Sequence, residues 1–285
     1  MSAASHLVNR LLVDAQALAA FIAYLQLIDS DPPGDALVSA EIRRVVDTLD
    51  GRELADSLEP GDRAVLINLA DSYLRQALDL IDSPGRTGAW TVTDPAVLQA
   101  QGSASGGVAR LIARGGLGKP DARILDVGTG VAAVAIVFCE IFPEATVVGI
   151  DPWEPALGLG RENVTRAGLD HRITLLPLRI EDLEDSDGFD LVWLPTFFIP
   201  ESVIDSALRT IFDSTRQGGT VVLGVMESPD EPLAAAVDRL FTVRSGGSTL
   251  TAAEAWARLE NTGFGDLQEV DTSGLPLRLI VGKKE

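Results

Sequence analysis

The residues best suited to chemistry gather where a short β-rich run meets a pair of glycines. The run Arg123–Val127 contains Asp126 and leads into Gly128 and Gly130, and an apolar helical stretch follows. Glycines at a strand-to-helix turn let the backbone approach a ligand closely, and the following helix offers N–H groups and the positive end of its dipole. Asp151 ends the next β-rich run, 21 residues after Gly130, where a carboxylate can accept both hydroxyls of an adenosine ribose. This spacing predicts a nucleoside-binding site.

Two kinds of ligand fit such a turn. Gly128, Gly130 and Ala133 satisfy the G-x-G-x-x-G/A fingerprint of dinucleotide-binding proteins. Asp126, however, stands two residues before the first glycine, and a carboxylate there would repel a pyrophosphate. An ammonium or sulfonium group is compatible with that carboxylate, so the residues favour a cationic amino-acid cofactor over NAD(P).

The surrounding elements alternate between strand and helix from Pro120 onward. Strands are expected at Arg123–Val127, Thr146–Ile150, Ile173–Pro177, Phe189–Leu194, Thr220–Val225 and Leu277–Gly282. Such alternation predicts an α/β fold with a Rossmann-like, doubly wound and mainly parallel sheet. Ligands of such sheets bind outside the carboxyl ends of the strands.

The chain before this alternation has an all-helical pattern. Leu11–Ile28 is strongly apolar but interrupted by polar residues, and we expect a buried helix whose surplus apolar surface faces a partner subunit, not a membrane span. Two further helices are expected at about residues 36–49 and 63–81. We therefore predict a helical dimerisation domain at residues 1–88 and an α/β domain at residues 89–285.

Five segments of the α/β region, in this order, resemble the motifs of class I S-adenosylmethionine (SAM)-dependent methyltransferases. They are ILDVGTGVA, VVGID, RIEDL with FDLVWL, GGTVVLG and TAAEAWARLENTGFGDLQEV, within roughly Gln99–Lys283. The helical N-terminal region is similar to that of small-molecule members that dimerise through such a segment. The resemblance implies SAM as the cofactor and methyl transfer as the activity.

The resemblance also implies roles for individual residues. Asp126 would bind the methionine amino group, and Asp151 would hold the ribose hydroxyls. Gln101, Ser103 and Ser105 could reach the methionine carboxylate. Further cofactor contacts are expected from Gly128, Gly130, Pro152, Trp153, Ile180, Glu181 and Leu194.

The sequence departs from the family at two places in this site. Arg179 stands where an acidic residue near the adenine is common, so Ile180 and Glu181 are the expected substitutes. Val131 and Ala132 stand where many members carry a third glycine. The methyl group of Ala132 should be tolerated there.

Methyl transfer from a sulfonium is an in-line displacement on an activated carbon, so orientation of the reactants can supply much of the acceleration. No histidine follows His171, and the Asp/Asn-Pro-Pro-Tyr signature of some nitrogen methyltransferases is missing. Glu227 is a conceivable general base, but the sequence assigns no catalytic residue.

The methyl acceptor should lie beside the aromatic residues that follow the fourth expected strand. Phe197 and Phe198 are found there, and Trp90 lies between the two domains, which suggests a small apolar or aromatic acceptor. The segment Leu194–Pro200 contains no carboxylate, so we expect transfer without a divalent metal.

Composition narrows the partners and leaves two other function classes open. A net charge of −19 disfavours nucleic acid and acidic membranes. The single cysteine, Cys139, cannot form an intrachain disulfide. We therefore expect the protein to be located in a reducing cytoplasm. The alternatives are an NAD(P)-binding oxidoreductase and a catalytically silent cofactor-binding scaffold.

Overall fold

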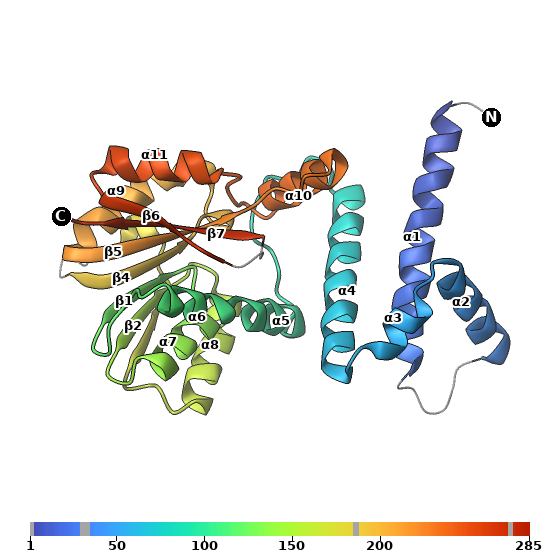
Figure 1. The fold of residues 1–285 in the computed structure, drawn as a ribbon, viewed down its shortest axis with the longest axis horizontal. Helices are drawn as coiled ribbons and strands as arrows, with labels where there is room; N and C mark the ends of the chain where they lie inside the picture. Colours follow the sequence, from blue (N-terminus) through green and yellow to red (C-terminus); the bar gives the residue numbers. More distant parts are fainter. Residues whose placement is uncertain (1–2, 29–34, 185–187, 273–275) are drawn as a thin grey trace. The chain divides into compact units, whose positions relative to one another are not determined.

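The computed structural model describes residues 3–28, 35–184, 188–272 and 276–285. The chain divides into two units, Met1–Pro84 and Gly85–Glu285, each with its own core (Figure 1). The sequence analysis placed this boundary a few residues later, after residue 88.

The described part of the first unit is helical. Its helices are α1 (Ala3–Ile28), α2 (Ala36–Thr48), α3 (Arg52–Ser57) and α4 (Pro60–Asp82). A small core joins Tyr24 and Leu25 of α1 to Val46 of α2 and Ala55 of α3. The Tyr24 hydroxyl donates a hydrogen bond to Asp56 at 2.8 Å, which fixes α1 against α3. The short helix α3 was not expected from the sequence.

Helix α1 is mostly exposed within its own unit, which corrects the expectation of a buried helix. The side chains of Leu12 and Val13 are 57% and 66% exposed. The unit's core takes its α1 residues from the last turns, between Phe21 and Ile28, so the earlier turns contribute nothing to it. By length and composition alone, residues 4–28 could also cross a membrane.

The second unit is built on a seven-stranded sheet with the order β3-β2-β1-β4-β5-β7-β6. Its strands are β1 (Arg123–Val127), β2 (Thr146–Ile150), β3 (Ile173–Leu176), β4 (Phe189–Pro195), β5 (Thr215–Met226), β6 (Gly265–Val270) and β7 (Leu277–Lys283). Strands β1 to β5 are parallel to one another, and β7 is antiparallel to both β5 and β6. The predicted Rossmann-like, mainly parallel sheet is confirmed.

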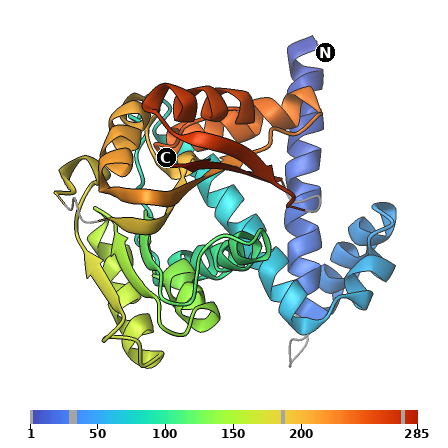
Figure 2. The ribbon, with the colours of Figure 1, turned by 60° about the vertical axis from the view of Figure 1, so that its left-hand side comes forward.

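Helices cover both faces of this sheet (Figure 2). The helices of this unit are α5 (Pro95–Ser105), α6 (Gly107–Arg114), α7 (Ala133–Ile141), α8 (Glu154–Arg166), α9 (Ile204–Ser214), α10 (Pro232–Arg244) and α11 (Ala252–Thr262). Ile124 and Leu191 belong to the core beneath α6 and α7, whereas Leu125 and Val192 belong to the core beneath α9 and α11. Successive strand residues point to opposite faces, so the apolar runs of β1 and β4 contribute to both cores.

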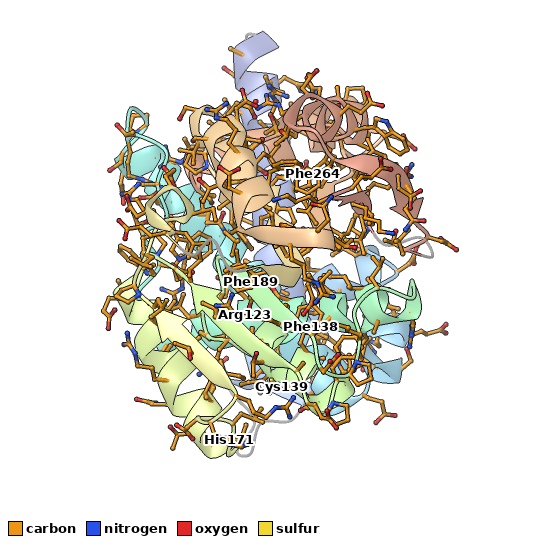
Figure 3. All side chains as sticks on the ribbon, turned by 90° about the vertical axis from the view of Figure 1, so that its left-hand side faces the viewer. Arg123, Phe138, Cys139, His171, Phe189 and Phe264 are labelled. Carbon is orange, nitrogen blue, oxygen red and sulfur yellow. The ribbon has the colours of Figure 1, made fainter. Side chains whose placement is uncertain are left out.

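The chain order reverses beside β1. After β1 the chain adds β2 and β3 on one side, and it then returns to place β4 on the other side. In open α/β sheets the ligand crevice lies at such a reversal, outside the carboxyl ends of the strands. Arg123 begins β1, and its guanidinium lies over the ring of Phe189 at 4.3 Å. His171 lies in the turn before β3. Both residues are therefore at the amino ends of the strands, opposite the expected crevice (Figure 3).

Candidate functional site

The turn after β1 has the backbone geometry of a ligand cradle. Gly128, Gly130 and Ala132 have positive φ angles of 69°, 52° and 63°. The N–H groups of Gly128 and Thr129 both donate to the carbonyl of Ile150, at 2.8 and 3.1 Å, which fixes the turn to the end of β2. A Cβ atom added to Gly128 would lie 3.8 Å from Pro195 Cγ, and one added to Gly130 would lie 4.0 Å from the Gly128 carbonyl oxygen. The glycines therefore leave open space in front of the turn.

The two carboxylates predicted from the sequence lie at this turn. Asp126, in β1, is buried, and its carboxylate accepts a hydrogen bond from the Thr129 hydroxyl at 2.7 Å. Burial raises the pKa of Asp126 to about 7, against the lowering effect of the Thr129 hydrogen bond, and the nearby charge of Asp151 raises it further. A cation placed beside Asp126 would reverse this shift.

Asp151 follows β2 directly and is held by two backbone donors. Its Oδ2 atom accepts the N–H of Gly130 at 3.0 Å, and its Oδ1 atom accepts the N–H of Trp153 at 2.7 Å. Burial raises the pKa of Asp151, and these two hydrogen bonds lower it in part. Each carboxylate oxygen keeps further acceptor capacity, so the group can receive two hydroxyl donors.

A cavity of about 620 Å³ connects these carboxylates to an aromatic wall. Its lining includes eight of the residues that the sequence analysis assigned to the cofactor but not Leu194; the eight are Asp126, Gly128, Gly130, Asp151, Pro152, Trp153, Ile180 and Glu181. Arg179 also lines it. The side chain of Leu194 is buried in the core beneath α9 and α11, whereas its neighbours Trp193 and Pro195 line the cavity. The alternation of side chains along β4 explains this difference.

The aromatic wall contains the three residues expected to contact the acceptor. Phe198 lies edge-on to Trp90, with ring centroids 5.5 Å apart, and edge-on to Phe197 at 4.7 Å. All three line the cavity. Such rings provide an apolar surface that suits an aromatic ligand.

Two hydrogen bonds hold the segment that contains Trp90. The N–H of Ala89 donates to the carbonyl of Arg244 at 3.0 Å, and the indole N–H of Trp153 donates to the carbonyl of Val92 at 2.7 Å. The segment containing Trp90 is thus attached on one side to the end of α10 and on the other to the adenine side of the expected site.

Helix α5 contributes a part of the cavity that sequence analysis described incompletely. Gly102 lies so close to Val131 that an added Cβ atom would come within 2.1 Å of the valine side chain. Gln101 and Ser105 line the cavity, and the Gln101 Oε1 atom is buried without a hydrogen-bond partner among the described residues. The side chain of Ser103 is outside the described set. The Asp94-Pro95 pair was an available sequence signal, because Asp94 caps α5 and Pro95 occupies its first turn.

The charged residues of the cavity lie on the side expected to hold the cofactor. They are Asp126, Asp151, Arg179 and Glu181. Glu227 does not line the cavity, and its carboxylate pairs with Arg278 at 3.2 Å. In the described parts of the chain, no group of three or more His, Cys, Asp or Glu side chains is arranged to hold a metal ion.

The fold is Rossmann-like, and its crevice is lined by the glycine turn and two carboxylates. Comparisons with known proteins show what this part of the chain resembles. Residues 124–219 match the model of the methyltransferase domain. The chain is 30% identical over 101 residues to release factor glutamine methyltransferase of Rhodopirellula baltica, which covers 35% of this chain and 34% of that protein. The matched region thus spans about a third of that relative's length. Residues 124–219 form a methyltransferase domain.

Solved structures extend the likeness to the whole fold. The structure of mitomycin 7-O-methyltransferase has a TM-score of 0.70 and 19% identity, over 99% of this chain and 98% of that chain. The human N-acetylserotonin methyltransferase, solved in complex with SAM, has a TM-score of 0.68 and 14% identity, over 100% and 98%. The chain therefore has the class I SAM-dependent methyltransferase fold with a helical N-terminal region.

Proposed function

We propose that this protein is a SAM-dependent methyltransferase that acts on a small apolar or aromatic metabolite. The observation that carries the proposal is the single cavity that joins the Asp126–Gly130 turn and Asp151 to the rings of Trp90, Phe197 and Phe198. One end suits an adenosine bearing an amino-acid cation, and the other suits a planar acceptor.

The residues of the turn fit this cofactor. The open space beside Gly128 and Gly130 admits a ligand next to the backbone, and Asp126 supplies a negative charge for an ammonium group. Asp151 is oriented by two backbone donors and can accept ribose hydroxyls, and Trp153 lies next to it on the adenine side. When bound, SAM supplies a methyl group on a sulfonium, which is an activated electrophile.

The protein's part in the reaction is to hold and align the reactants. The turn fixes one reactant, and the aromatic wall orients the other, so that the acceptor atom and the methyl group are brought into line. We assign no general base. We propose that the transfer needs no metal ion, as expected from the sequence. We also propose that the acceptor is a small molecule and not nucleic acid, in keeping with the net charge of −19.

We also propose a homodimer in which α1 is the main contact. The apolar side chains of Leu7, Leu11, Leu12 and Leu18 are between 41% and 57% exposed within the first unit. An apolar surface of this kind on a soluble chain favours association with a second copy.

Calorimetric titration with SAM, S-adenosylhomocysteine and NAD tests the cofactor. Micromolar binding of the first two without binding of NAD supports the proposal, and binding of NAD alone would favour the oxidoreductase. A screen of phenols and nitrogen heterocycles with SAM labelled in its methyl group then tests turnover. Cofactor binding without transfer to any acceptor class would favour the silent scaffold.

A further inference from the structure

The hydroxyl of Thr129 donates a hydrogen bond to Asp126, the carboxylate of this site whose pKa burial raises to about 7. Thr129 is buried between the two glycines of the turn, and its Oγ1 atom donates to Asp126 Oδ2 at 2.7 Å. Its backbone is fixed independently, because its N–H donates to Ile150 and its carbonyl accepts the N–H of Ala132. The side chain is therefore not needed to close the turn.

Strand β2 leaves room for this hydroxyl. Gly149 pairs with Asp126 in the sheet register. A Cβ atom on Gly149 would lie 2.7 Å from Thr129 Oγ1 and 2.8 Å from a methyl group of Leu175. Gly149 has no positive φ angle, so the space beside it explains the glycine better than its backbone conformation does. Strand β1, the glycine turn and strand β2 together allow the Thr129 hydroxyl to reach Asp126.

We propose that Thr129 is a positioning residue, whose hydroxyl holds the Asp126 carboxylate ionised and turned toward the cationic end of the cofactor. The inference rests on the proposed function, because it takes the methionine ammonium as the partner of Asp126. A hydrogen bond to an ionised carboxylate favours the charged form. The hydrogen bond thereby helps to keep a buried carboxylate available near neutral pH, and no cation among the described residues contributes to the pKa of Asp126.

The other charged groups at this site do not replace the hydroxyl. Asp151 raises the pKa of Asp126, whereas the Thr129 hydroxyl and the backbone N–H of Ala135 lower it. The remaining charged side chains that line the cavity are Arg179 and Glu181, which follow β3 and do not contribute to this shift. Thr129 is the side chain that opposes the effect of burial.

The test is the affinity for S-adenosylhomocysteine between about pH 5.5 and pH 8.5, measured by calorimetry on the full chain. The variants are Thr129→Val, which keeps the shape without the hydroxyl, and Thr129→Ser, which keeps the hydroxyl. We expect the wild-type affinity to rise with pH and level off near pH 7. In Thr129→Val the levelling point should move up by about one pH unit, with a roughly three- to tenfold loss of affinity at pH 7. Thr129→Ser should keep the wild-type profile.

The background variant Asp126→Asn separates positioning from packing. There, Thr129→Val should cause no further change in pH dependence. A Thr129→Val profile with the wild-type midpoint, an equal shift in Thr129→Ser, or a shift that persists with Asp126→Asn would each overturn the inference. If Thr129→Val does not fold, Thr129→Ala serves as the variant without the hydroxyl. Wild-type protein that binds no S-adenosylhomocysteine at any pH would instead overturn the proposed function itself.

Discussion

The backbone N–H of Gly130 donates to Asp151 Oδ2 at 3.0 Å, although the two residues belong to different strand-to-helix connections. This bond joins the glycine turn after β1 to the carboxylate after β2. The turn that would hold the methionine end of the cofactor therefore also orients the group that would hold its ribose. A change at either residue should affect both parts of the site.

Replacement of Asp151 should weaken cofactor binding strongly. Asp151→Ala removes acceptors for two ribose hydroxyls and a partner of Gly130, and we expect a loss of about 1–3 kcal/mol in binding free energy for S-adenosylhomocysteine. Calorimetry measures this loss. Asp121→Ala removes the same charge from an exposed residue just before the amino end of β1, and it should leave the affinity for S-adenosylhomocysteine unchanged. Equal affinities of wild type and Asp151→Ala would refute the assignment.

The stability of the unliganded protein should carry the signature of Asp126. Because burial raises the pKa of Asp126 in the folded state to about 7 from the ordinary value of 3.8, the folded state binds the proton more tightly than the unfolded state between these pH values. The contribution of Asp126 to the free energy of unfolding should therefore fall as pH rises from about 4 to 7 and stay constant above that. Denaturant unfolding of wild type and Asp126→Asn should show a difference in the free energy of unfolding that changes by about 4 kcal/mol across this window. A difference independent of pH would contradict the shifted pKa.

Two glutamines on α5 should respond in opposite directions when each is replaced by methionine. The Oε1 atom of Gln101 is buried without a partner among the described residues, so Gln101→Met should stabilise the unliganded protein by about 1 kcal/mol. Gln99 exchanges two hydrogen bonds with Asn163, at 3.2 and 3.0 Å, and Gln99→Met should destabilise it by a similar amount. Denaturant unfolding of both variants provides the measurement. Destabilisation by Gln101→Met would mean that its amide has an important partner in solution.

The aromatic wall should govern acceptor affinity without affecting the cofactor. Phe198→Ala removes the ring that contacts both Trp90 and Phe197, and we expect binding of 2-naphthol, a planar probe, to weaken by about 1 kcal/mol. Phe198→Leu restores apolar bulk without a ring and should recover only part of that loss. Titration in the presence of S-adenosylhomocysteine measures both ligands. An equal loss of cofactor affinity would place Phe198 in a structural role instead.

Charge placed on α1 should separate the copies of the chain. Light scattering at micromolar concentration should give a dimer for wild type and a monomer for Leu12→Asp, because Leu12 is exposed and apolar in the first unit. Gln16→Glu adds charge at an already polar position of the same helix and should remain dimeric. Flotation of monomeric wild-type protein with neutral lipid vesicles would show that α1 meets a membrane instead.

The parts of the fold and site that depend on local pattern could be predicted from the sequence. The apolar runs of β1 and β4, the glycine turn and the placing of Asp151 after β2 follow from neighbouring residues and from the period of the strands. The orientation of Leu194 away from the cavity depended on the register of β4, which the run of apolar residues did not reveal. The exposure of α1 and the burial of the Gln101 Oε1 atom depended on which elements pack together, and residue types alone do not determine that.

The position of β7 has a consequence for the order in which the second unit can form. This strand pairs with β5 on one side and β6 on the other, and Leu279 and Ile280 are buried in opposite cores. During synthesis, residues 215–226 and 265–270 emerge before the strand that must come to lie between them. Until residues 277–283 are available, β5 has an unpaired edge and β6 has no strand to join. A ribosome-bound chain stopped before residue 277 would therefore expose the unpaired edge of β5, to which strands of other chains can pair.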